Sequence, residues 1–120
     1  MKAFKIVEFA LEKKARNPVV LDVSQFFSLY DYFIVCSAET GRQVRAIYEE
    51  IEKKCKESNI DIHHFEDDHA CRWILIDLFD ILIHIFVDEA RDFYNLEYLW
   101  RDAKKLQLPK KIKKSSFSIN

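Results

Sequence analysis

Two apolar runs of strand length, residues 73–78 and 81–87, stand close together near the middle of the chain. Only Phe79 and Asp80 separate them, which predicts a β-hairpin at the centre of the fold. In the second run both alternating sets of positions are apolar except for His84, so we expect that strand to be covered on both faces. The polar residues that need an explanation in this segment are Asp77, Asp80 and His84.

The first part of the chain has helical spacing of apolar residues. This spacing predicts a helix over residues 2–15, ended by Asn17-Pro18, and then a strand over residues 19–23. Ile6 and Phe9 widen the apolar surface of this helix beyond one stripe. The extra width would suit packing on the sheet or a contact with a second copy of the chain, so a homodimer is one expectation.

The clearest amphipathic helix begins after Thr40, because Gln43 stands at the spacing of a capping box. It places five apolar side chains on one face and is expected to close at Ser58-Asn59. Strands are predicted at residues 32–38 and 61–66. The apolar face consists of Val44, Ile47, Tyr48, Ile51 and Cys55.

After the hairpin, residues 88–106 predict two short helices that break near Asn95, and residues 109–120 form a basic tail that we expect to be flexible. The predicted order is α-β-β-α-β-β-β-α. It defines a single α/β (α+β) domain over residues 1–108, with a mixed five-stranded sheet and helices packed against it.

Composition limits the function classes. The chain has 120 residues, is 49% hydrophobic and 32% charged, and carries a net charge of −1, which gives no general reason to expect nucleic-acid binding. No apolar stretch reaches 18 residues, so we expect a cytoplasmic protein without a membrane partner. Three cysteines without CxxC pairing indicate reduced thiols. Gly41 is the one glycine, which excludes glycine-rich phosphate loops, and no cofactor is expected.

Two groups of residues could carry function. Asp77 and Asp80 could form a pair of carboxylates that holds a metal ion. The simpler interpretation is that they accept hydrogen bonds from the backbone of the hairpin turn. Residues 93–100 are unusually aromatic, and these side chains either fill the core or anchor a protein interface. Histidines and a cysteine between residues 63 and 71 lack the paired spacing of zinc ligands, so no metal is expected. No serine or cysteine has the surroundings of a nucleophile, so we expect no catalytic residues.

The order of several blocks resembles the Iojap-like ribosomal silencing factor family, from residue 2 to about residue 104. The blocks are Leu21-Asp22-Val23, residues 31–38 (DYFIVCSA), Arg42-Gln43-Val44, residues 73–77 (WILID), residues 80–86 (DILIHIF) and residues 91–100 (RDFYNLEYLW). Relatives commonly carry glycine where this chain has Phe79 and where it has Asp67. Phe79 tolerates a positive φ poorly, so the turn geometry is the main question raised by the resemblance.

The resemblance implies a nucleotidyltransferase-like fold without catalysis. It implies a translational repressor that binds the large ribosomal subunit through ribosomal protein uL14 and sterically blocks joining of the small subunit, without sequence-specific nucleic-acid binding. Alternatives are a large-subunit assembly factor that uses the same surface or a vestigial nucleotidyltransferase using Asp77 and Asp80. In the main reading the aromatics are anchors and the carboxylates pair with basic groups of the partner. The expected partner-binding residues are Trp73, Leu75, Asp77, Phe79, Asp80, Tyr94, Leu96, Tyr98, Leu99 and Trp100.

Overall fold

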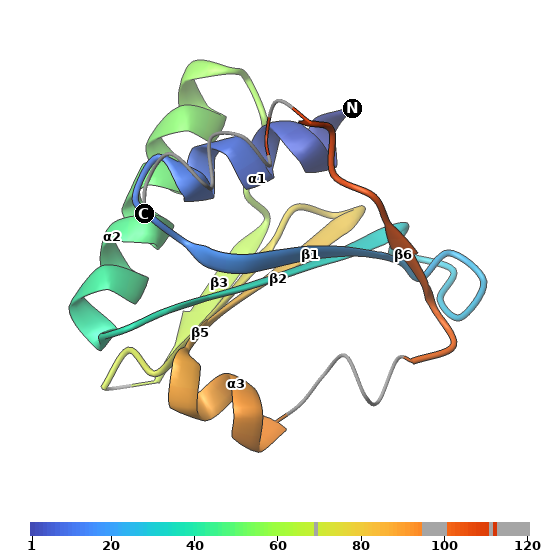
Figure 1. Ribbon diagram of the computed structural model, residues 1–120. Helices are drawn as coiled ribbons and strands as arrows, with labels where there is room; N and C mark the ends of the chain where they lie inside the picture. Colours follow the sequence, from blue (N-terminus) through green and yellow to red (C-terminus); the bar gives the residue numbers. More distant parts are fainter. Residues whose placement is uncertain (69, 95–100, 111, 113–120) are drawn as a thin grey trace.

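The computed structural model describes residues 1–68, 70–94, 101–110 and 112, which form a mixed sheet with helices on both faces (Figure 1). The strand order is β3-β4-β5-β2-β1-β6, in which β2 and β5 are parallel and the other neighbours antiparallel. The predicted α+β class and mixed sheet are confirmed. The elements are α1 (Lys2–Leu11), β1 (Arg16–Asp22), β2 (Tyr32–Ala38), α2 (Gly41–Glu57), β3 (His64–Asp67), β4 (Trp73–Asp77), β5 (Ile81–Val87), α3 (Asp88–Tyr94) and β6 (Lys104–Leu106).

The sheet has six strands, and the prediction of five was wrong. Residues 104–106 were expected to be helical, but they form β6, with Leu106 opposite Val20 and Lys104 opposite Asp22. A strand this short and charged shows no alternation of apolar and polar residues by which it could be predicted. It forms because the outer edge of β1 offers unpaired backbone N–H and C=O groups. The first predicted short helix is present as α3, which ends just before Asn95; the second falls largely on residues outside the described part.

The helix α1 ends four residues before the predicted end. Lys14 adopts a left-handed backbone with φ 63°, and the N–H of Ala15 donates to the carbonyl of Ala10 at 3.2 Å, which is the pattern of a Schellman C-cap. The strand β1 then begins at Arg16, three residues earlier than predicted. Its register shifts between Arg16 and Val19, around Asn17 with φ 49°. The strand therefore opens with a bulge that contains Pro18.

The helix α2 confirms the amphipathic prediction. The N–H of Gln43 donates to Thr40 Oγ1 at 3.2 Å, as the capping box requires, while Gln43 Oε1 accepts from the N–H of Glu39. The predicted apolar face, from Val44 to Cys55, is buried throughout. The helix ends at Glu57, with Ser58 as its C-cap.

Helices cover the two faces of the sheet unequally (Figure 1). The pair α1 and α2 lies on one face, where Ile74, Ile83 and Ile85 join the main core. On the opposite face α3 covers one part, and there Phe86 packs with Val35 and Ala90. The central strand β5 is thus buried from both sides, as its pattern predicted.

Two observations concern the predictions about the ends of the chain. Ile6 is 0% exposed and Phe9 is 8% exposed in the chain's own core, so the wide apolar surface of α1 is satisfied without a second chain, and the homodimer stays a prediction. Ile112, inside the tail expected to be flexible, is 2% exposed and packs into the same core, which anchors the chain at this residue. Within the described residues, no helix combines the length and the apolar composition needed to cross a bilayer.

Candidate functional site

The face of the sheet that carries α3 also displays a row of side chains from β4. Because side chains alternate along a strand, Trp73, Leu75 and Asp77 point to this face, while Ile74 and Ile76 enter the core under α1 and α2. Trp73 lies opposite Phe86, and Leu75 opposite His84. We call Trp73, Leu75 and Asp77 of β4, with His84 and Phe86 of β5, the aromatic face.

The rings of the aromatic face are stacked. The centroids of Trp73 and Phe86 lie 5.4 Å apart at an interplanar angle of 13°, and His84 lies 6.1 Å from each of them in nearly parallel orientation. Phe33 meets His84 edge-on at 5.4 Å. Trp73 and Leu75 are half-buried, whereas His84 is 5% exposed. The face thus presents partly exposed apolar groups held rigidly by stacking.

Burial among these rings lowers the pKa of His84 from 6.5 to about 4. Neither ring nitrogen of His84 has a hydrogen-bond partner among the residues that the structure describes. The side chain is therefore a neutral imidazole at physiological pH and serves as part of the packing. This packing explains the one polar residue in the otherwise apolar strand β5.

Asp77 organises the end of the aromatic face. Its Oδ2 accepts a hydrogen bond from the Tyr30 hydroxyl at 2.8 Å, and its Oδ1 accepts from the N–H of Phe79 at 2.8 Å. Burial, followed by the Asp77 carboxylate, raises the pKa of Tyr30. One carboxylate thus joins the loop before β2 to the turn between β4 and β5. This is the turn-bonding role that the sequence indicated for it.

The turn between β4 and β5 has unusual geometry at Phe79. Its φ is 76°, and the N–H of Asp80 donates to the carbonyl of Leu78 at 3.0 Å. A hydrogen bond across three residues with a central φ near +75° defines the rare, strained form of γ-turn. The Phe79 side chain is 56% exposed, and its ring lies 4.6 Å from that of His63. Phe79 thus adopts the positive φ that a phenylalanine is expected to tolerate poorly.

The structure brings only some of the predicted site residues together. Trp73, Leu75 and Asp77 share one face, with Phe79 at its end. Asp80 is separate, because its carboxylate binds Lys2 Nζ of α1 at 2.8 Å, and α1 covers the other face of the sheet. The side chains of the remaining predicted residues lie outside the described part of the chain: Tyr94, Leu96, Tyr98, Leu99 and Trp100.

Sequence reasoning missed two residues that build this side of the molecule. Tyr30 positions Asp77, and its only signal was its place in an aromatic loop. Arg91 donates from Nη1 to the carbonyl of Asn17 at 2.7 Å and to Ser37 Oγ at 3.2 Å. Its role depends on the bulge in β1, which the sequence did not predict.

The two candidate carboxylates have separate partners, and two of the three cysteines are buried. Asp77 and Asp80 are engaged by different partners, and no three His, Cys, Asp or Glu side chains of the described chain are placed to hold one metal ion. Burial raises the pKa of the Cys36 thiol to about 12 and that of Cys55 to about 11, which keeps both protonated. These thiols are not poised as nucleophiles.

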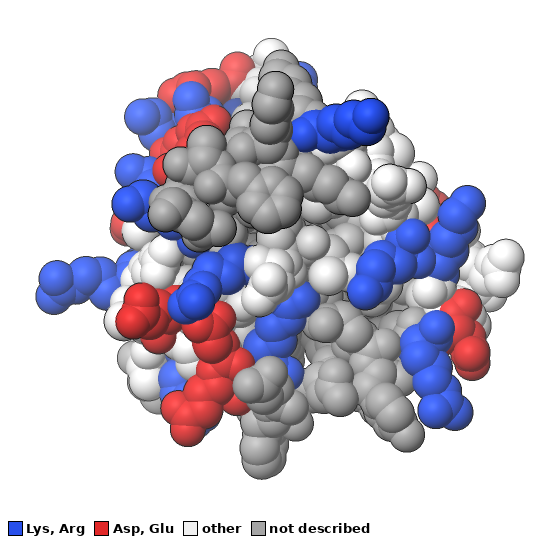
Figure 2. Space-filling view, in the orientation of Figure 1, with Lys and Arg blue, Asp and Glu red and all other residues white. Residues whose placement is uncertain are grey.

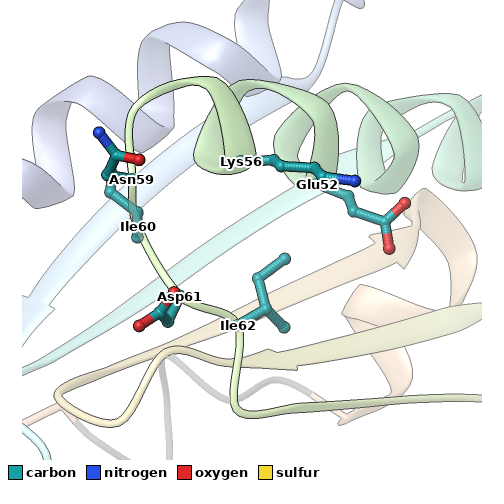
Figure 3. A pocket seen from close by; sticks show the side chains of 6 residues that line it. All are labelled: Glu52, Lys56, Asn59, Ile60, Asp61 and Ile62. Atoms are coloured by element: carbon teal, nitrogen blue, oxygen red, sulfur yellow. The ribbon is translucent and has the colours of Figure 1, made fainter.

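A groove of about 390 Å³ lies where α2 ends and the chain turns towards β3 (Figure 3). Glu52 and Lys56 extend from α2 along it, above Ile62. Its lining residues include no serine, cysteine or histidine. The groove therefore lacks the hydroxyl, thiol and imidazole groups of the common nucleophilic sites, and its ionisable side chains are Glu52, Lys56 and Asp61.

Comparison with known proteins decides the family. The family model described as "Ribosomal silencing factor during starvation" matches residues 2–118. The chain belongs to this family. The ribosomal silencing factor RsfS of Halalkalibacterium halodurans is 38% identical over 97 residues, which are 81% of this chain and 83% of that protein. A crystal structure of a Chromobacterium violaceum protein aligns with a TM-score of 0.79 at 28% identity, covering 90% of this chain and 91% of that one.

More distant relatives come from organelles. Protein Iojap of Zea mays chloroplasts is 30% identical over 107 residues, which are 89% of this chain and 46% of that protein. A mouse protein named for mitochondrial assembly of the ribosomal large subunit is 26% identical over 98 residues, which are 79% of this chain and 43% of that protein. The predicted family is confirmed, and membership implies ribosome-associated silencing of translation.

Proposed function

We propose that this silencing factor binds the large ribosomal subunit through ribosomal protein uL14 and sterically blocks joining of the small subunit. It acts as a binding protein without catalytic activity. The observation that carries the proposal is the aromatic face, where half-buried Trp73 and Leu75 lie on a rigid stack and are followed by the exposed ring of Phe79. Large apolar side chains pre-ordered in this way are typical anchors of protein interfaces.

The roles proposed for the carboxylates follow from their contacts. Asp77 already accepts two hydrogen bonds, so its main contribution is to hold Phe79 and Tyr30 in place for the partner. Asp80 is 44% exposed on its side chain and pairs with Lys2, so it can contribute a negative rim charge towards a basic partner. Residues 94–100 would complete the surface, as the family resemblance implies.

The test is a subunit-joining assay. Purified large and small subunits are mixed with excess wild-type protein, Trp73→Ala or Phe65→Ala, and joined ribosomes are separated by sedimentation. Phe65 is a matched control, because it is 39% exposed and stacks at 4.7 Å on Tyr48 of α2, on the other face of the sheet. We expect wild type and Phe65→Ala to prevent joining and Trp73→Ala to permit it. Normal joining in the presence of excess wild-type protein would sink the proposal.

A role in assembly of the large subunit is the second candidate, favoured by the name of the mouse relative. It would use the same aromatic face on an immature particle. A deletion strain distinguishes the two roles, because loss of an assembly factor leads to precursor particles. Loss of a silencing factor instead leads to excess joined ribosomes when nutrients are short.

A further inference from the structure

A second candidate surface lies beside the bulge of β1. It is a depression of about 460 Å³ lined by residues of β1, β2, α3 and β6. Three of its lining side chains are cationic, Arg16, Arg91 and Lys105, against a single carboxylate, Asp88. The depression therefore carries an excess of positive charge in a chain whose net charge is −1.

The bulge explains how the depression is built. The carbonyls of Arg16 and Asn17 lie where the register shifts, and Arg91 Nη1 donates to both, at 3.4 Å and 2.7 Å. The same atom donates to the hydroxyl of Ser37, which is 1% exposed. Arg91 is thus fixed in the depression by contacts with two backbone carbonyls and one hydroxyl. The guanidinium of an arginine stays protonated at any physiological pH.

The remaining cations are only weakly compensated. Arg16 pairs with Asp88 at 2.8 Å, but the two side chains are 52% and 41% exposed, and ion pairs so open to water exchange readily. Lys105 is exposed on β6 next to Lys104. Figure 2, in which β1 and β6 lie towards the viewer, shows Lys and Arg side chains on this side of the molecule, with Asp and Glu side chains among them towards the left and at the right edge. The lining of the depression, with three cations and one carboxylate, suits an anion.

The depression continues the aromatic face around α3. Val19 and Ser37 alternate onto the same face of the sheet as Trp73, since Val19 lies opposite Val35, which packs with Phe86. The order β4-β5-β2-β1 places β1 three strand spacings from β4, about 14 Å away. A standard interface covers about 800 Å² on each partner, so a body seated on Trp73 extends over the depression.

We infer that this depression binds backbone phosphates of ribosomal RNA when the silencing factor docks on the large subunit. The inference rests on the proposed function, because it requires that the chain binds the large subunit. That subunit consists of protein and RNA, and every nucleotide of its RNA carries a phosphate. Arg and Lys bind phosphates regardless of base sequence. The contact thus agrees with the expectation that the chain reads no nucleic-acid sequence. It adds affinity beside the contact with the ribosomal protein.

The test compares two partners and two pairs of substitutions. The phosphate variant carries Arg16→Gln and Lys105→Gln, and it leaves Arg91 intact because Arg91 holds the bulge. The control carries Lys5→Gln and Lys53→Gln, an equal loss of charge from exposed positions on α1 and α2, across the sheet. Affinities for purified large subunits are measured between 50 mM and 200 mM salt, and affinities for isolated uL14 are measured in the same buffers. Thermal melting confirms that each variant is folded.

We expect the phosphate variant to bind large subunits about tenfold more weakly at the lower salt, with the slope of log affinity against log salt reduced by about 1 to 2. Its binding to isolated uL14 should match the control. Equal weakening towards uL14 would mean that an acidic protein segment fills the depression, and unchanged binding to subunits would mean that nothing does. Either result overturns the inference and leaves the proposed function standing. Failure of wild type to bind subunits would overturn both.

Discussion

Replacing Phe79 by glycine and by alanine tests whether the turn stores backbone strain. With φ at 76°, any residue with a Cβ atom loses about 1–2 kcal/mol relative to an ordinary conformation. Glycine escapes this loss but is destabilised by about 0.5–1 kcal/mol through its greater freedom in the unfolded chain. Both substitutions remove the contact between the Phe79 ring and His63, so that loss cancels in the comparison. Phe79→Gly should therefore be more stable than Phe79→Ala by about 0.5–1 kcal/mol.

The assay is urea unfolding followed by circular dichroism, with the free energy of unfolding compared between the two variants. Lys53 provides the control, since it is exposed inside α2, four residues before the end of the helix, where the alanine variant should be more stable than the glycine variant by about 1 kcal/mol. The glycine variant should thus be the more stable one at position 79, and the alanine variant the more stable one at position 53. If alanine is as stable as glycine at position 79, or more stable, the turn is not strained as described.

Two further predictions concern His84 and Gly41. Because the pKa of His84 falls from 6.5 to about 4 on folding, the unfolded chain binds a proton that the folded chain does not, and stability should rise with pH across this window by about 3 kcal/mol. His84→Leu should flatten that rise in urea unfolding at pH 5 and pH 7.5; an equally steep loss of stability towards pH 5 in the variant would contradict the burial of a neutral imidazole. A Cβ atom on Gly41 would lie 2.7 Å from the carbonyl oxygen of Ala70, so Gly41→Ala should destabilise the fold by about 1–3 kcal/mol despite alanine's better helix propensity. A variant that melts at or above the wild-type temperature would refute this close approach.

The parts of the fold that were predictable have strong local patterns. The helix α2 combines a capping box with a complete apolar stripe, and β5 is apolar on both faces, so each could be located from its own residues. The errors in the bounds of α1 and β1 fall where non-glycine residues adopt positive φ. Lys14 lies at the C-terminal end of α1 and Asn17 in the bulge of β1. Lysine gives no sign of a left-handed backbone, and asparagine, although enriched in that conformation, adopts it only in a minority of cases.

The same limit applies to the candidate site. Alternation along β4 was enough to place Trp73 and Leu75 on one face. The Arg91 contacts depend on a bulge 74 residues earlier in the chain, and β6 exists only as a partner of β1. Such features arise when distant segments meet, so they are absent from any local pattern.

The proposed contact between the aromatic face and ribosomal protein uL14 can be measured by a binding titration with the isolated protein. Wild type, Trp73→Ala and the control Phe65→Ala are titrated in the same buffer after their folding has been checked by thermal melting. We predict tight binding by wild type and Phe65→Ala, and a Kd at least about 30-fold weaker for Trp73→Ala, which corresponds to the roughly 2 kcal/mol of an interface hot spot. Equal affinity of all three for uL14, or no binding by any of them, would contradict the claim.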